Sequence, residues 1–170
     1  ADEIWKVRPV APYKKTMNAR WDGFVTKVAA DGKSLVYSTY LGSTIQAVCS
    51  GLAIDGAGSA YVTGLTYSHA FPVKKAFQKT FGGGTADAFI SKLAPAGDSL
   101  VYSSYFGGPG YDTGWAIAVD GTGAAYLVGV TNGTLPVKNA FQKTRKGGYD
   151  GYAAKVAPDG KSLVYASYLG

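Results

Sequence analysis

A unit of about 64 residues is repeated along this chain, and the repetition limits which folds the chain can adopt. The segment SLVYSTYLG at 34–42 returns as SLVYSSYFG at 99–107 and as SLVYASYLG at 162–170. A second motif, which begins at Asp22, Asp87 and Asp150, precedes each copy at the same distance. Because repeats of this kind bury their apolar residues against neighbouring repeats, we expect a repeat architecture.

Each unit contains four short apolar segments rich in Val, Ile, Tyr and Phe, which are typical of β-strands. In the first complete unit these segments lie at 52–55, from 60 onward, at 89–93 and within 99–107. The Asp-Gly-x-Gly sequences at 55–58 and 120–123 predict tight hairpin turns, because glycine adopts positive φ angles at low cost.

The connection between the second and third strands of a unit is roughly twenty residues long. It carries the motif FPVKKAFQKT at 71–80 and LPVKNAFQKT at 135–144, and a degenerate copy, PVAPYKKT, occupies 9–16. The only segment compatible with a helical turn is KKAFQK at 74–79. The sequence therefore predicts an all-β protein with one long loop in each unit.

Four antiparallel strands in a unit of this length are typical of a β-propeller blade. The motifs LVYSTYLG, GGPGYDTGWAIAVDGTGAAYLVGVT and LPVKNAFQKTRKGGYDGYAAKV resemble the bacterial β-propeller repeats called SBBP, and the resemblance covers residues 9–170. It implies a propeller in a bacterial secreted, periplasmic or cell-surface protein. One departure is GSTIQAVCSG at 42–51, which replaces the Gly-Gly-x-Gly-x-Asp sequence at 107–112.

The phase of the repeat predicts an incomplete ring of about two and a half blades, because closed propellers contain about four to eight. We divide the chain into an N-terminal extension with a degenerate loop (1–21), a half-blade with its following loop (22–49) and two blades (50–107 and 108–170). All belong to one propeller domain. We expect the remaining blades to come from a longer form of the same protein, with partner subunits as the alternative.

The net charge of +6 is distributed unevenly over the repeat. In an antiparallel blade the long connections emerge on one face and the tight turns on the opposite face. The turn aspartates gather on the face of the tight turns. We therefore expect a basic loop face that docks an acidic protein, an anionic glycan or a membrane surface, while lysines that only keep the loops soluble are the alternative. The acid-free segments 8–20, 71–80 and 135–146 supply this face with Arg8, Lys14, Lys15, Arg20, Lys74, Lys75, Lys79, Lys138, Lys143, Arg145 and Lys146.

Side-chain combinations for catalysis or metal binding are sparse. His69 is the only histidine, so neither a Ser-His-Asp arrangement repeated in each blade nor a His-rich metal site can be built. Each turn aspartate offers one carboxylate, whereas calcium takes about six to eight oxygens. We expect no enzymatic activity, no cofactor and no metal, and we expect Asp22, Asp87 and Asp150 to bond the loop before each third strand.

One acidic residue, Asp112, is retained as a candidate ligand contact because it lies beside Tyr111 and Trp115 in a glycine-rich loop. This loop favours an alternative function, a carbohydrate- or anionic-polymer-binding propeller. The single cysteine, Cys49, cannot form an internal disulfide and is expected to pack at the start of a strand.

The leading interpretation is a non-enzymatic scaffold that docks a protein partner. A third alternative is an enzyme whose site is completed by other blades. Aromatic residues recur with the repeat, as Tyr37, Tyr102 and Tyr165 do, so we expect them to pack between blades and not to bind nucleic acid. No apolar run approaches the length needed to span a bilayer.

Overall fold

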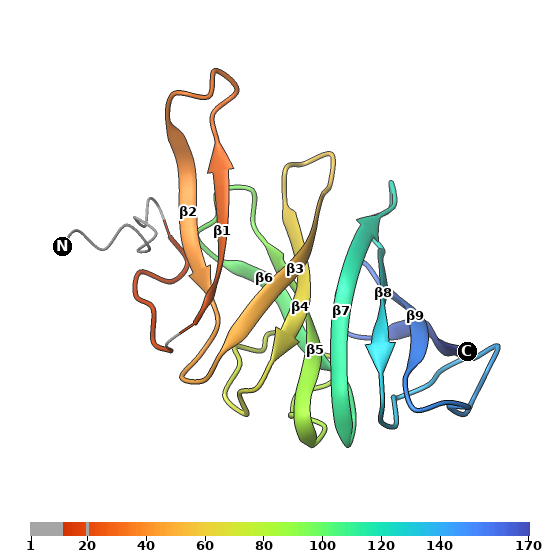
Figure 1. The fold of residues 1–170 in the computed structure, drawn as a ribbon. Helices are drawn as coiled ribbons and strands as arrows, with labels where there is room; N and C mark the ends of the chain where they lie inside the picture. The colour runs from red at the N-terminus through yellow and green to blue at the C-terminus, as the bar shows by residue number, and fades with distance from the viewer. Residues whose placement is uncertain (1–11, 20) are drawn as a thin grey trace.

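The computed structural model describes residues 12–19 and 21–170, which form ten β-strands and no helix (Figure 1). The segment 74–79, which the sequence predicted to be compatible with a helical turn, is an irregular loop with bends. The strands are β1 (Gly23–Val28), β2 (Leu35–Leu41), β3 (Ala47–Ile54), β4 (Ala60–Thr66), β5 (Gly84–Leu93), β6 (Leu100–Phe106), β7 (Gly110–Val119), β8 (Ala125–Thr131), β9 (Asp150–Val156) and β10 (Leu163–Leu169).

Strand pairing follows the order of the chain within each repeat unit. Strands β3, β4, β5 and β6 pair successively and antiparallel, and β7, β8, β9 and β10 do the same. Strands β1 and β2 form a separate two-stranded sheet. The β1–β2, β3–β4 and β7–β8 turns lie at the upper edge of Figure 1 and the long connections at the lower edge, as the turn chemistry predicted.

The sheets are mixed, whereas the sequence predicted purely antiparallel ones. Gly84 and Ala86 of β5 pair in parallel with Gly110 and Tyr111 of β7, which joins the two groups of strands. Both strands begin several residues before the apolar segments that predicted them, and their early parts run side by side. A Cβ on Gly84 would lie 2.1 Å from the Gly110 nitrogen, so the close approach requires glycine there.

Two hydrophobic clusters fill the spaces between successive groups of strands. One joins β1–β2 to β3–β6 through residues such as Val25, Tyr37 and Phe89. The other joins β3–β6 to β7–β10, where the Phe106 and Tyr152 rings are 5.0 Å apart. At both junctions the ring of a tyrosine, Tyr37 or Tyr102, covers a glycine in the next unit's turn, Gly97 or Gly160. The recurring tyrosines therefore pack between units, as the repeat predicted.

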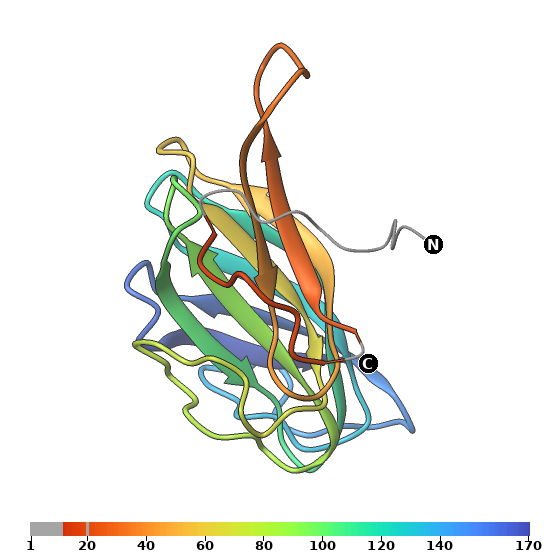
Figure 2. The ribbon, with the colours of Figure 1, turned by 90° about the vertical axis from the view of Figure 1, so that its left-hand side faces the viewer.

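Each long connection forms a strap along the outer edge of its sheet, which is visible beside β6 in Figure 2. We call residues 71–80 strap 1 and residues 135–144 strap 2. Lys74 exchanges backbone hydrogen bonds with Ser103 of β6, and Lys138 does so with Ala166 of β10. The Gln78 side chain then accepts from the Gly107 N–H and donates to Asp87. The straps thus cover the edge strands, which would otherwise expose unpaired backbone groups.

Replacing Gly160 with alanine is expected to destabilise the fold more than replacing Gly32. Both glycines have left-handed φ angles, 75° and 70°, so alanine costs about 1–2 kcal/mol at either position. Only at Gly160 would the new Cβ lie 2.2 Å from the Tyr102 ring, which adds about 1–3 kcal/mol of overpacking. Urea unfolding measures both, and equal losses for G160A and G32A would contradict the packing of Tyr102 on Gly160.

Candidate partner-binding groove

The straps carry several basic residues away from the loop face on which the sequence placed them. The ammonium group of Lys74 donates to the Leu100 carbonyl at 2.5 Å, and that of Lys138 donates to the Leu163 carbonyl at 2.6 Å. Both carbonyls begin a strand next to a tight turn. These lysines therefore point along the outer edge of each sheet toward the tight turns. They can do so because each strap runs beside β6 or β10 toward the turns before it turns back.

A lysine-lined groove lies where strap 1 meets the next repeat unit. Its volume is about 460 Å³, and Val73 and Ala76 contribute apolar surface. Lys161 lines the groove from the β9–β10 turn, which sequence analysis assigned to the opposite, aspartate-bearing face. None of its lining residues is acidic: the charged ones are Lys74, Lys75, Lys79 and Lys161.

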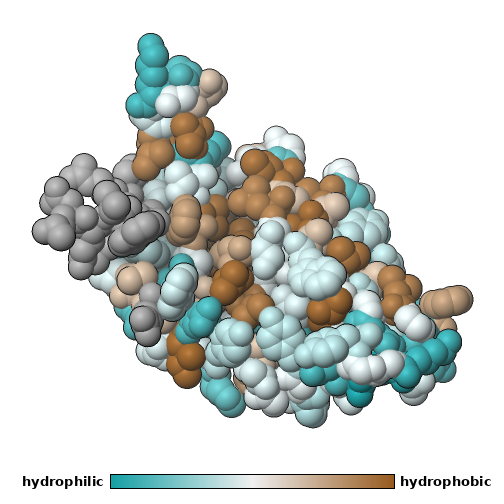
Figure 3. Space-filling view, viewed as in Figure 1, coloured by the Kyte–Doolittle hydropathy of each residue, from teal (hydrophilic) through white to brown (hydrophobic). Residues whose placement is uncertain are grey.

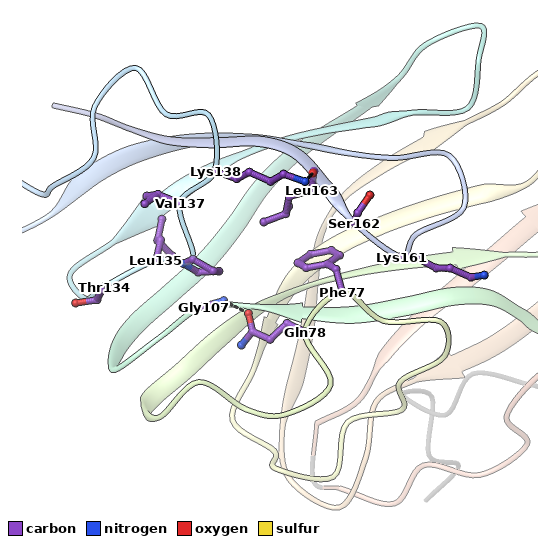
Figure 4. Close-up of a pocket in the computed structure, with 11 residues that line it drawn as sticks. Phe77, Gln78, Gly107, Thr134, Leu135, Val137, Lys138, Lys161, Ser162 and Leu163 are labelled. Atoms are coloured by element: carbon purple, nitrogen blue, oxygen red, sulfur yellow. Dashed lines mark hydrogen bonds between the residues drawn. The ribbon is translucent and has the colours of Figure 1, made fainter.

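A second groove adjoins the first, and Lys161 lines both of them (Figure 4). It occupies about 590 Å³ between strap 1, strap 2 and the start of β10, and it is lined by Phe77, Leu135 and Leu163. Lys138 adds a further positive charge. We refer to the two together as the perimeter groove, which offers apolar side chains flanked by ammonium groups.

The other predicted basic residues have separate positions. Lys14 forms an ion pair with Asp22 at 2.6 Å and is half-buried, so its charge is already balanced. Arg145 donates to the carbonyls of Gly147 and Gly148. Exposed residues that line neither groove are Lys15, Lys143 and Lys146. Arg8 and Arg20 lie outside the described residues.

The candidate ligand loop does not bring its three residues together. Asp112 is fully buried, and its carboxylate accepts from the Gly108 N–H at 2.8 Å. Trp115, in contrast, is 59% exposed. Tyr111 is half-buried, and its backbone N–H donates to Asn132. Asp112 therefore has a structural position, and only the tryptophan offers much surface to a ligand.

The carboxylates at the start of each third strand bond the preceding loop, as the sequence predicted. Asp87 accepts from the Gly82 N–H at 2.7 Å, Asp150 from the N–H groups of Lys146 and Gly147, and Asp22 from that of Asn18. Cys49 also packs as expected near the start of β3. Burial raises the pKa of its thiol to about 12, and the negative charge of Asp22 adds to that rise.

Two of the acids meet, which the sequence pattern did not indicate. The carboxyl groups of Asp87 and Asp112 both lie against Gly107, where an added Cβ would be 2.8 Å from one and 2.7 Å from the other. One oxygen of each, Oδ1, is buried without a hydrogen-bond partner. Burial, together with the nearby Asp112 carboxylate, raises the pKa of Asp87 to about 7. Burial also raises the pKa of Asp112.

The first junction differs at two positions that the repeat makes equivalent. There Asp22 faces Gly42 and Ala47, so the second acid is missing, and Lys14 supplies an ammonium group where Gln78 has an amide. The sequence does signal this difference, because GSTIQA replaces Gly-Gly-x-Gly-x-Asp at 42–47. This replacement can be interpreted only once Asp22, Gly42 and Ala47 are known to meet.

The variant Asp112→Asn is expected to flatten the pH dependence of stability. Asp87 titrates near pH 3.9 when unfolded and near 7 when folded, so its stabilising contribution is complete below about pH 4 and is lost as the pH rises toward 7. The amide removes one charge and lowers the pKa of Asp87. The free energy of unfolding should then change less between pH 4 and 8, by at least about 1 kcal/mol.

Chemical denaturation at a series of pH values measures this effect. Asp98→Asn, in an exposed turn, is the matched control and should keep the wild-type profile. A wild-type profile for Asp112→Asn would show that the two acids are not coupled.

Comparison with known proteins identifies the repeat. The family model SBBP, described as a beta-propeller repeat, matches residues 36–72 and 101–136. The matches cover equivalent parts of successive units, from β2 through β4 and from β6 through β8, and each ends in the connection that carries a strap. A search of curated proteins found no match. Among the described residues, no helix is long and apolar enough to cross a membrane.

Proposed function

Because this chain carries SBBP β-propeller repeats, we propose that it is a non-enzymatic propeller scaffold that docks an acidic protein partner in the perimeter groove. The observation that carries the proposal is the convergence of lysines from two repeat units on one acid-free groove. We further propose that the scaffold belongs to a bacterial secreted, periplasmic or cell-surface protein, a setting that the resemblance to SBBP repeats supports.

Exposed apolar side chains at the two ends of the molecule support an incomplete ring of about two and a half blades. Phe24 is 55% exposed on β1, whereas the equivalent Phe89 on β5 is fully buried against the preceding unit. At the other end Phe141 of strap 2 is 91% exposed, whereas the equivalent Phe77 of strap 1 packs against the second cluster. Both ends therefore suit contact with further blades of a longer form of the protein.

The charge and shape of the perimeter groove favour a protein partner. Ammonium groups around apolar side chains complement a segment that alternates carboxylates with apolar residues. Lys75 and Lys79 are exposed and have no acidic neighbour in the lining. An anionic glycan would be attracted by the same charges, but it would leave the exposed apolar side chains of Val73 and Val137 without a partner.

The surroundings of the polar residues support a structural role without catalysis. Asp55 and Asp120 each bond the backbone of their own hairpin turn. His69 is exposed and stacks on Phe81 with ring centroids 4.3 Å apart. Each of these side chains therefore has a local structural contact that accounts for its position.

The triple variant Lys75→Glu, Lys79→Glu and Lys161→Glu is expected to weaken binding of an acidic peptide at least about tenfold. The probe is a fluorescein-labelled peptide of alternating Glu and Leu, titrated by fluorescence anisotropy. Reversing three charges replaces attraction by repulsion at the groove, so the loss should shrink as salt is added.

The matched control carries the same change in net charge at exposed residues that line neither groove: Lys15→Glu, Lys33→Glu and Lys143→Glu. It should bind within about twofold of the parent. Equal losses in the two triple variants would show that net charge, and not the groove, attracts the peptide. Tighter binding of heparin or of anionic vesicles would instead favour a glycan or a membrane surface.

A further inference from the structure

We propose that β1 and the hollow beside it bind a two-stranded hairpin that has an Asp-Gly-x-Gly turn and a tyrosine as the second residue of its second strand. The inference rests on the propeller proposal, but it concerns a different surface from the perimeter groove. Three observations carry it: an unpaired strand edge, a lysine without its usual partners, and an apolar hollow of matching position.

The first observation is the free edge of β1. Strand β5 pairs with β4 on one side and β6 on the other, and β9 pairs likewise with β8 and β10. Among the described strands, β1 pairs with β2 alone. Its second edge therefore presents backbone groups in the position where the other units hold the second strand of a hairpin.

The second observation is that Lys27 lacks the partners that the equivalent lysines have. In the equivalent position, Lys92 donates to the Tyr61 hydroxyl at 2.6 Å and lies 3.1 Å from the Asp55 carboxylate. Lys155 lies 3.4 Å from Asp120 and 4.7 Å from the Tyr126 ring centroid. Each lysine thus meets one aspartate from the hairpin turn and one tyrosine from the hairpin's second strand.

Lys27 has no ion-pair partner among the described residues. Its register on β1 corresponds to Lys92 on β5, which pairs directly with Tyr61. A hairpin that meets Lys27 as the other two hairpins meet their lysines carries the same two groups, a carboxylate in the turn and a tyrosine just after the turn. This requirement defines the chemistry of the occupant.

The third observation is the hollow between β1 and β3. It has a volume of about 290 Å³ and is lined by Val25 and Lys27 on one side and by Leu52 and Ile54 on the other. Leu52 and Ile54 are 51% and 61% exposed, whereas the equivalent Ile117 and Val119 are partly buried against the preceding unit. Figure 3 shows hydrophobic surface over this part of the molecule, between the β1–β2 hairpin and β3.

The occupant is a hairpin like β7–β8 of this same repeat, supplied free of its own third strand. A second copy of the chain does not offer one, because its β4 and β8 are already paired with β5 and β9. The N-terminal segment 1–11 does not match either, since its sequence contains no Asp-Gly turn and no tyrosine. Continuity with the packing of the two complete units therefore points to a further hairpin of the SBBP type.

The test uses the full chain and a synthetic peptide with the sequence of residues 112–131, which contains both Asp120 and Tyr126. We expect the peptide to slow hydrogen exchange of the β1 amides, 23–28, and to bind measurably by calorimetry. Lys27→Met should weaken this binding at least about tenfold, because a charge-assisted contact is lost while the apolar stem remains. Lys33→Met, in the exposed β1–β2 turn, is the matched control and should bind like the parent.

A second measurement does not depend on whether the isolated peptide forms a hairpin. The same sequence is fused to the N-terminal end of the chain, and thermal unfolding is compared with that of a fusion carrying both Asp120→Asn and Tyr126→Phe in the added hairpin. The unmodified fusion should raise Tm above that of the substituted fusion and of the parent chain, and should protect the β1 amides.

Three results would overturn the inference: no protection of β1 in either format, equal binding to the Lys27→Met variant, or a dimer that already protects β1 without peptide. The triple variant of the perimeter groove, Lys75→Glu, Lys79→Glu and Lys161→Glu, separates this surface from the proposed function, because it should bind the hairpin peptide normally. Loss of acidic-peptide binding together with normal hairpin binding would leave the present inference standing.

Discussion

Backbone groups at the edge of a β-sheet need hydrogen-bonding partners, and most features of this structure satisfy that need in different ways. The straps cover β6 and β10 from outside through Lys74 and Lys138. The parallel contact at Gly84 and Gly110 joins neighbouring sheets where β5 and β7 extend beyond their antiparallel partners. Among the described strands, β1 and β3 each keep one edge without a partner strand, and at β1 a lysine also lacks the partners that its equivalents have. The edges therefore connect the fold to the proposed docking of further strands.

Much of the fold was predictable from the sequence, because the repeat displays its strands and turns more than once. The strand order within each unit, the tight turns and the packing of tyrosines between units all followed from side-chain patterns. The straps did not, since Lys74 and Ser103 pair through backbone atoms and any side chain permits such bonds. The early starts of β5 and β7 were missed for a related reason: these parts are rich in glycine and polar residues, and neighbouring backbone holds them.

The candidate site was only partly predictable for the same reason. Lysines of the long connections were recognised as a basic group, but their position depended on a strap whose path the sequence does not show. Lys161 belongs to a tight turn, and the sequence predicted such turns on the opposite face from the long connections. Only the path of strap 1 brings Lys75 and Lys79 to Lys161. The acidic pair at Gly107 was also missed, because Asp87 and Asp112 belong to different units. Its contrast with Lys14, Asp22 and Ala47 shows that junctions with the same backbone can differ in charge.

The contact between a tyrosine ring and a turn glycine has a consequence for the geometry of the whole assembly. Tyr37 on Gly97 and Tyr102 on Gly160 place one aromatic ring between neighbouring units at their turn ends. Since the same ring-on-glycine contact occurs at both junctions, the packing of one unit on the next depends on residues of those two units alone. A duplicated unit would bring both the tyrosine and the turn glycine with it, so the array could lengthen by whole units while every junction keeps the same contact.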